Sequence, residues 1–173
     1  MKKLLAFICL CIQIVPIRGQ SVLRTSHGVK VETKAVCVEL ECFSASIIRV
    51  KKYPLGQAPE KQSLSVTMQP EKVKYKIQEA NNQVIFTTSE LTVLLDIIQN
   101  QVRFATKDGK ELLAEKPSST GFTSFNDAGN STYRIRQTFL LDSDEAIYGL
   151  GQHQRGKMNQ RNQTLFFQQA NTE

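Results

Sequence analysis

Apolar residues recur at every second position through most of the chain, and this period constrains what the chain can fold into. Val36, Val38 and Leu40 share one face of a segment whose other face carries Glu39 and Glu41. Side chains of an extended strand alternate between the two faces of a sheet, so this segment has one apolar and one solvated face. No stretch combines helix caps with a 3.6-residue apolar period, and we therefore predict an all-β chain.

Further segments alternate in the same way and are rich in the β-branched and aromatic residues that strands favour. They comprise residues 48–50, 73–77, 84–88, 91–98 and 133–141. The segment 91–98 is apolar on both faces, which predicts a strand buried on both sides. Lys72, Lys74 and Lys76 alternate with apolar residues, and we interpret them as the solvated face of a strand.

The connections between these strands have the composition of tight turns. Asn81-Asn82, Gln99-Asn100 and Asp108-Gly109 each separate two apolar runs, and the last pair favours a type I′ turn. Residues 53–71 are predicted to form a longer loop with a short strand over residues 64–68, and residues 118–130 a polar surface loop. Short strands joined by frequent turns predict an antiparallel β-sandwich.

The first 20 residues have the layout of a secretory signal peptide, with Lys2 and Lys3 ahead of an uncharged apolar run over residues 4–15. The run is too short for a comfortable membrane span, which needs about 20 apolar residues. We expect residues 1–20 to be removed and residues 21–173 to form one exported domain, periplasmic or extracellular, with no membrane contact after removal of the signal. A lipid anchor at Cys11 is disfavoured but left open, because Ile8 and Cys9 are not the small residues that precede a lipoprotein cysteine. Loss of Lys2, Lys3 and Arg18 lowers the formal charge from +6 to +3, too little to indicate a nucleic-acid partner.

Cysteines and histidines do not indicate a metal site or a disulfide framework. Two of the four cysteines, Cys9 and Cys11, lie in the predicted signal peptide. Cys37 and Cys42 point to opposite faces of an alternating segment, which disfavours a disulfide between them. The two histidines lie far apart and neither has metal-ligand spacing. We expect no metal and no cofactor.

No group of side chains stands out as a catalytic set. An enzyme that works through paired carboxylates needs them to face each other across a pocket, whereas most acids here are isolated in strands and loops. Asp142, Asp144 and Glu145 do cluster, directly after the last predicted strand, and turn formation is the simpler interpretation. We assign no catalytic residue.

The most informative segment spans residues 144–154. Gly149 and Gly151 follow a predicted strand end and permit backbone angles or close approaches that a side chain would block. A run of amides and cations follows over residues 152–163, and such groups hydrogen-bond hydroxyl-rich ligands. Composition alone favours an ordinary polar loop over a ligand site, and both interpretations stay open at this point.

This segment resembles a strand and turn characteristic of glycoside hydrolase family 31, and its His-Gln variant is most similar to the bacterial α-xylosidase branch. The family's Tyr-Gly-Leu-Gly, followed by Glu or Gln, is matched by Tyr148, Gly149, Leu150, Gly151, Gln152, His153 and Gln154. The last three residues are similar to the Asn-Thr-Glu or Asn-Thr-Asp that follows in the family. Upstream, residues 91–96, 102–104, 108–109 and 112–113 match its hairpin pattern, so the resemblance covers roughly residues 25–173.

The resemblance implies a β-sandwich similar to galactose mutarotases, packed against a (β/α)8 barrel that carries an aspartate nucleophile and an aspartate acid/base. Such a barrel needs about 200 further residues or more, and the nucleophile motif is absent here, so the chain is expected to end before it. The implied partners are this barrel and, through the parent enzyme, an α-linked oligosaccharide, with xylose favoured over glucose. The candidate substrate-binding residues, which approach a pocket-shaping loop, are Asn171, Thr172 and Glu173.

Three interpretations of function remain open. The first is an N-terminal domain of an exported α-glycosidase, serving as scaffold and pocket wall and inactive alone. Such a domain exposes an apolar face in isolation, and we expect it to express poorly or to oligomerise. The second is a free-standing exported carbohydrate-binding sandwich, for which Phe122 and Phe125 are the candidate platform, because the chain has no Trp. The third is a structural domain without a ligand.

Overall fold

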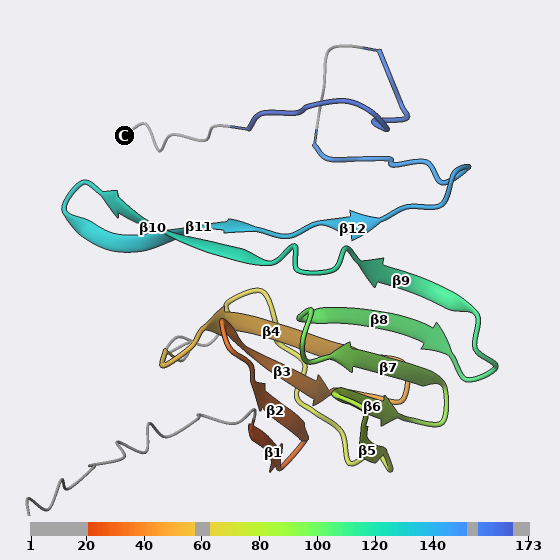
Figure 1. Cartoon of the computed structure of the whole chain (residues 1–173). Helices are drawn as coiled ribbons and strands as arrows, with labels where there is room; N and C mark the ends of the chain where they lie inside the picture. The colour runs from red at the N-terminus through yellow and green to blue at the C-terminus, as the bar shows by residue number, and fades with distance from the viewer. Residues whose placement is uncertain (1–20, 58–62, 152–155, 168–173) are drawn as a thin grey trace, which may run out of the picture.

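The computed structural model describes residues 21–57, 63–151 and 156–167, and every regular element in these ranges is a β-strand (Figure 1). All strand pairs are antiparallel. The first sheet has the order β1-β2-β3-β4 and comprises β1 (Ser21–Thr25), β2 (Gly28–Glu32), β3 (Val36–Cys42) and β4 (Ile48–Pro54). These findings confirm the predicted all-β antiparallel fold.

The second sheet has six strands in the order β12-β9-β8-β7-β6-β5. It comprises β5 (Lys76–Ala80), β6 (Gln83–Thr87), β7 (Leu91–Asp96), β8 (Gln101–Thr106), β9 (Glu111–Glu115) and β12 (Phe139–Leu140). Between β9 and β12 the chain leaves this sheet to form a separate hairpin of β10 (Gly121–Asp127) and β11 (Asn130–Arg136). Residues 141–167, where described, contain no regular strand and run above the hairpin in Figure 1.

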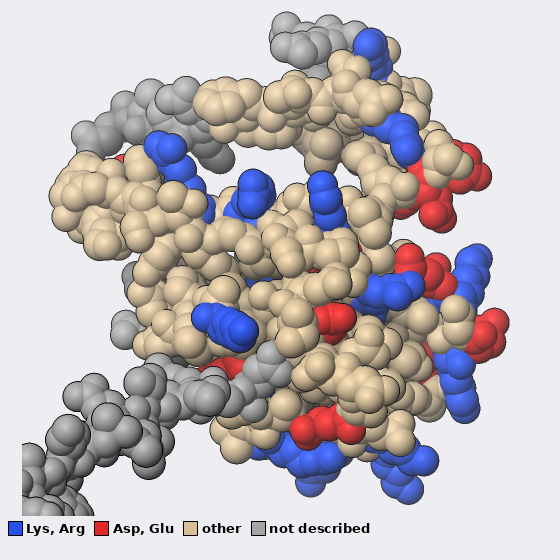
Figure 2. Space-filling model, in the orientation of Figure 1, with Lys and Arg blue, Asp and Glu red and all other residues tan. Residues whose placement is uncertain are grey.

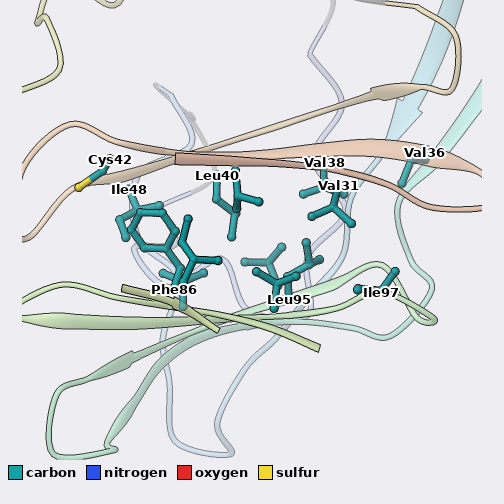
Figure 3. Packing of buried hydrophobic residues seen from close by; sticks show 14 residues of the cluster. Val31, Val36, Val38, Leu40, Cys42, Ile48, Phe86, Leu95 and Ile97 are labelled. Carbon is teal, nitrogen blue, oxygen red and sulfur yellow. The ribbon is translucent and has the colours of Figure 1, made fainter. Parts of the chain in front are cut away.

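The core lies between the first and second sheets, whose apolar faces point toward each other (Figure 3). Val31, Val38 and Leu40 from the first sheet meet Phe86 and Leu95 from the second, and each is at most 1% exposed. Burying a side chain of this kind contributes about 1.5–3 kcal/mol. The alternation of Val36, Val38, Leu40 and Cys42 that the sequence shows is the inner face of β3, as predicted.

The outer face of the first sheet carries a ladder of charged pairs. Glu39 lies opposite Lys51, and their Oε2 and Nζ atoms are 2.5 Å apart. The Tyr53 hydroxyl donates to Glu39 Oε1 at 2.5 Å. Burial acts to raise the pKa of Glu39, but the hydrogen bonds from Lys51 and Tyr53 outweigh it and hold that pKa below its ordinary value.

The two cysteines of the described chain are both free and buried. Cys42 points into the core, whereas Cys37 lies on the outer face, opposite Tyr53. The expectation of no disulfide between them is therefore correct. Burial raises the pKa of the Cys37 thiol, which lowers its reactivity.

The turns follow the sequence signal at Asn81-Asn82 and depart from it at Asp108-Gly109. Asn81 and Asn82 both have positive φ, +52° and +61°, as a type I′ hairpin requires. At Asp108-Gly109 only the glycine has positive φ, +91°, so the type I′ prediction is wrong. The Thr106 N–H instead bonds the Lys110 carbonyl at 2.9 Å across a three-residue loop that places Gly109 at the left-handed position.

Two local predictions are wrong. A predicted loop contains a strand, and a predicted short strand is irregular. Residues 118–130, expected to be a loop, contain β10, whose polar composition reflects a hairpin exposed over most of both faces. Residues 64–68, expected to be a short strand, have no strand partner in the described chain, and Leu64 is 98% exposed. A polar composition indicates that a segment is exposed to solvent, not that it lacks strands. A hairpin with both faces exposed therefore resembles a loop in its sequence.

The predicted strand over residues 133–141 is two strands, because the chain changes partner at Gln137 and Thr138. The Thr138 carbonyl accepts the Lys116 N–H at 2.9 Å and the Ser119 hydroxyl at 3.1 Å, which breaks the run. The strand predicted over residues 91–98 is β7, and it is fully buried on one face only, since Ile98 is 58% exposed. The described residues include no helix long and apolar enough to cross a membrane.

Candidate functional site

The glycine-flanked turn lies in the irregular segment after β12, without the strand end that the sequence predicts before it. Backbone φ is +86° at Gly149, +62° at Leu150 and +92° at Gly151, so three consecutive residues are left-handed. This conformation costs a non-glycine L-residue roughly 1–2 kcal/mol. A Cβ added at Gly151 would also lie 3.2 Å from a ring carbon of Phe167. Glycine is therefore favoured by backbone angle at both positions and by contact at the second.

A set of hydrogen bonds ties the segment before this turn to the segment after it. The Ile147 carbonyl accepts the Gln160 N–H at 2.7 Å, and the Ile147 N–H donates to Asn159 Oδ1 at 3.2 Å. The Arg161 guanidinium donates to the carbonyls of Asp142, at 2.7 Å, and Glu145. These bonds close a compact loop around the turn and leave Tyr148 66% exposed at its surface.

Arg161 and Asn159 belong to the polar run over residues 152–163, for which the sequence permits two interpretations, an ordinary loop or a ligand site. In the structure both side chains are engaged with backbone groups of the chain itself, which is a structural role. The acidic cluster Asp142–Glu145 is a turn, since Glu145 N–H donates to the Asp142 carbonyl at 3.2 Å. The turn interpretation of those acids is therefore correct.

The remaining residues of the motif and the predicted substrate-binding residues lie outside the described residues. These are Gln152, His153, Gln154, Asn171, Thr172 and Glu173. Their roles stay predictions. The structure brings Gly151 against Phe167, which places the turn beside the segment that leads to residues 171–173.

The two phenylalanines proposed as a sugar platform lie on β10 and are already engaged. Phe122 is partly buried against the core and makes an edge contact with Tyr133, with ring centroids 6.2 Å apart. The Arg134 guanidinium lies 4.3 Å from the centre of the Phe125 ring. A sugar that stacked on Phe125 from that side would have to displace Arg134, so the geometry does not favour the platform.

A buried ion pair that was not predicted from the sequence joins the two sheets at the edge of the core. Lys52 Nζ on β4 lies 2.5 Å from Glu115 Oε2 on β9, with side-chain exposures of 8% and 9%. The ammonium also donates to the Asn100 carbonyl at 2.9 Å and to Thr120 Oγ1 at 3.0 Å. Burial lowers the pKa of Lys52, and the hydrogen bond and charge of Glu115 oppose that shift.

The sequence carries a signal for the lysine of this pair, but not for its partner. Ile48, Val50 and Lys52 share one face of β4, and Lys52 lies opposite Val38, whose side chain is in the core. A lysine at an inward register position has to find an acidic partner or shift its pKa. Extending the alternation predicted for residues 48–50 by one position would have located Lys52, but only the fold supplies Glu115.

An apolar hollow of about 350 Å³ opens beside the ion pair. We use "apolar hollow" for the space lined by Val50, Lys52, Phe104, Leu113, Glu115, Gln137 and Phe139. Leu113 is 41% exposed and Phe139 is 45% exposed. Two large apolar side chains therefore stand at an opening that the described part of the chain leaves unfilled.

Exposed apolar side chains are concentrated around and beyond this hollow. Of the seventeen exposed large hydrophobic residues in the described chain, twelve follow Glu111. They are Leu112, Leu113, Phe125, Ile135, Phe139, Leu140, Leu141, Tyr148, Leu150, Met158, Phe166 and Phe167. An accumulation of this kind marks an interaction surface rather than ordinary scatter.

Within the described residues no group of three or more His, Cys, Asp or Glu side chains is placed to hold a metal ion.

The two-sheet antiparallel fold is that of a galactose-mutarotase-like β-sandwich. The chain belongs to the glycosyl hydrolase 31 N-terminal galactose mutarotase-like domain family, whose profile matches residues 37–172. The resemblance read from the Tyr148–Gln154 motif is therefore confirmed at the level of the family.

The curated proteins similar to this chain include an α-xylosidase and an α-glucosidase. An α-xylosidase of Saccharolobus solfataricus is 33% identical over 119 residues, 69% of this chain and 16% of that protein. The α-glucosidase 2 of Bacillus thermoamyloliquefaciens is 24% identical over 141 residues, 82% of this chain and 17% of that protein. The chain thus spans about a sixth of the length of these relatives.

The solved structures that share the fold include two family 31 α-xylosidases. A family 31 α-xylosidase of Xanthomonas citri superposes with a TM-score of 0.77 at 33% identity, covering 86% of this chain and 16% of that one. A family 31 α-xylosidase from a soil metagenome, solved with xylose, superposes with a TM-score of 0.65 at 19% identity. The latter covers 84% of this chain and 24% of that chain, and at this identity it supports the fold alone.

Proposed function

We propose that this chain is the non-catalytic N-terminal domain of an exported α-glycosidase of the α-xylosidase type, and that it acts as a scaffold and as part of the wall of the sugar pocket. The apolar hollow and the exposed apolar residues around it carry this proposal. A face of this composition stabilises a complex when a second apolar surface covers it, at roughly 25 cal/mol per Å² of apolar area removed from water. A catalytic domain of the same enzyme is the natural partner, because the family's proteins are several times longer than this chain.

A chimera tests the scaffold role. The equivalent domain of the Xanthomonas citri α-xylosidase would be replaced by residues 21–173 of this chain, and hydrolysis of an aryl α-xyloside would be measured. We expect a folded, active chimera that loses activity when Phe139→Asp or Leu113→Asp places a carboxylate in the apolar hollow. Leu64→Asp is the matched control, since Leu64 is 98% exposed and lies outside the hollow.

Unfolding of the isolated chain shows whether a variant loses activity because it fails to fold or because it fails to dock on the catalytic domain. Phe139 is 45% exposed, so Phe139→Asp should leave the unfolding midpoint of the isolated chain nearly unchanged, while Phe139→Leu should restore activity in the chimera. Equal activity of the Phe139→Asp and Leu64→Asp chimeras would exclude the hollow as the docking surface.

The pocket-wall role rests on Asn171, Thr172 and Glu173. In the same chimera, Asn171→Ala and Glu173→Ala are expected to raise KM for the xyloside more than they lower kcat, because wall residues contribute to binding rather than to chemistry. Thr164→Ala, upstream in the same segment and exposed, is the control. Unchanged KM in both variants would contradict the pocket-wall role.

Export rests on the layout of residues 1–20. Expression of the full chain in a bacterium should yield a periplasmic product whose N-terminal sequence begins near Ser21. Leu10→Arg interrupts the apolar run and should keep the product in the cytoplasm. A periplasmic product that retains Met1 would contradict cleavage, and no periplasmic product from the unaltered chain would contradict export.

A further inference from the structure

A second hollow, of about 1000 Å³, lies on the side of the sandwich away from the glycine turn. Its walls come from the turn between β1 and β2, residues 71–76, the end of β6 with residues 88–89, and the turn between β8 and β9. We call it the basic groove, because its charged lining consists of Lys72, Lys74, Lys76 and Lys107 against Glu71, with His27 at its edge. Figure 2 shows Lys and Arg side chains gathered along the lower edge of the molecule, where Figure 1 places β1 and β5.

The lysine row is held in place by the core. Val73 and Tyr75, which alternate with the lysines, pack against the hydrophobic cluster, and Tyr75 stacks on Phe86 with ring centroids 4.8 Å apart. The segment is anchored at its start, where the Glu71 N–H donates to the Phe43 carbonyl at 2.9 Å. The three lysines therefore occupy alternate positions of a segment that turns at Lys72, where the Val73 N–H donates to the Glu71 carbonyl at 3.0 Å. The strand expected over residues 73–77 is regular only from Lys76 onward.

The fourth lysine reaches the groove from a distant part of the sequence. Lys107 lies in the turn after β8, and its N–H donates to the Glu90 carbonyl at 3.0 Å, which fixes this turn beside the end of β6. Among the ion pairs of the described residues, none includes any of the four lysines. The groove thus combines four cations with a single carboxylate, and the fold, not the local sequence, brings them together.

The rest of the lining is suited to a sugar chain. Ser26, Thr87 and Ser89 add hydroxyl groups that donate and accept hydrogen bonds. Four cations spread over an open groove fit a chain with repeated charges better than one small anion, because each further charge of the same chain binds at a raised effective concentration. Grooves for single-stranded nucleic acids commonly add aromatic side chains on which the bases stack, whereas the tyrosine of this groove, Tyr75, already stacks on Phe86.

We propose that the basic groove binds an acidic polysaccharide whose charges are uronate carboxylates, and that it thereby holds the parent enzyme on a charged glycan while the sugar pocket acts elsewhere. The role of the groove in holding the parent enzyme on a glycan rests on the proposed function. The binding itself belongs to the groove and is measurable on the chain alone.

The test is affinity electrophoresis of the full chain in gels that contain polygalacturonate, with pullulan as the neutral polymer. We expect retardation by polygalacturonate alone, abolished when salt is raised from about 0.05 M to about 0.5 M. The triple variant Lys72→Gln/Lys74→Gln/Lys76→Gln should bind about tenfold or more weakly. Lys34→Gln/Lys116→Gln/Lys157→Gln is the matched control, since it removes the same charge from exposed lysines outside the groove.

Three results would overturn the proposal. Equal weakening in the two triple variants would show that net charge, not the groove, holds the polymer. Equal retardation by pullulan would remove the role of the carboxylates. Single-stranded DNA that competes as well as polygalacturonate at equal charge would assign the groove to a different polyanion.

Failure of this inference is distinguishable from failure of the proposed function. The groove triple variant should leave the chimera's hydrolysis of a small aryl α-xyloside unchanged, because the apolar hollow and the glycine turn are untouched. An inactive chimera would leave polygalacturonate binding by the chain itself unaffected.

Discussion

Residues 21–106 and residues 111–167 place their apolar side chains in opposite ways. All fourteen residues of the buried cluster lie between Val29 and Val102. Of the seventeen exposed large hydrophobic residues in the described chain, twelve lie in the second region and five in the first. The first region has a core of its own between two sheets, whereas the second presents apolar groups outward, as a surface that packs on another body does.

The sharpest test of this difference compares one aromatic residue from each region. Phe86, fully buried, should lose about 3–5 kcal/mol of unfolding free energy on replacement by alanine, through lost transfer energy and the cavity left behind. Phe139→Ala removes a side chain that is 45% exposed and should cost less than about 1 kcal/mol in the isolated chain. Urea unfolding measures both. Similar losses would mean that the second region shares the core of the first.

The connection between the regions is tested next, at the Lys52–Glu115 pair. Lys52→Met leaves a buried carboxylate without its cation and should cost about 3 kcal/mol. The double variant Lys52→Met/Glu115→Leu should recover much of that loss, because both charges are then gone. Arg103→Met, which breaks the half-exposed Arg103–Glu111 pair, is the control and should cost less than about 1 kcal/mol. A double variant as unstable as the single one would show that the site stabilises through its other hydrogen bonds.

A smaller effect is expected from pH, and it concerns the first region alone. The pKa of Glu39 is held below its ordinary value, so the stability from this carboxylate is fully present above the unfolded pKa near 4.5 and is lost as pH falls through the lowered pKa. The unaltered chain should therefore lose more unfolding free energy than Glu39→Gln between neutral pH and the acid side of pH 4.5. Parallel pH profiles would show that Lys51 and Tyr53 do not stabilise the ionised form.

The smallest effect on global stability is expected at Arg161, within the second region. Arg161→Gln removes the bonds to the Asp142 and Glu145 carbonyls, which lie far from the core. The unfolding midpoint should stay within error, while chymotrypsin should cut beside Tyr148 faster, since local opening exposes that bond. Lys157→Gln, exposed and nearby, is the control. An unchanged rate of cleavage would show that the loop is held by other contacts.

The sequence predicted the first region much better than the second. Alternation marks β3, β6 and β7 because one face of each is buried against the opposite sheet, and burial is what selects apolar residues at every second position. In β10 and β11 both faces are mostly exposed, so no such selection acts and the hairpin has the composition of a loop. The pairing of Lys52 with Glu115 joins positions 63 residues apart, and no local pattern encodes it.

Some features of the candidate site could likewise be predicted from the sequence, and others could not. Gly149 and Gly151 were recognisable because a left-handed backbone demands a particular residue type at a particular position. The apolar hollow was not, because Leu113 and Phe139 look like any strand residues until the fold shows that nothing described covers them. From the sequence, Lys72, Lys74 and Lys76 are interpreted as the solvated face of one strand. Lys107 is distant in sequence, and only the fold places it beside them in the basic groove.

The β10–β11 hairpin is closed at its base by the pairing of Gly121 with Arg136, and the chain returns to the second sheet at β12 within three residues. Its tip, Ala128-Gly129, has positive φ at both positions and contacts no part of the core cluster. Foreign sequence placed at this tip would leave both ends of the insertion close together and the register of every core strand unchanged. The tip is thus a position at which a further domain could be inserted without changing the fold of the sandwich.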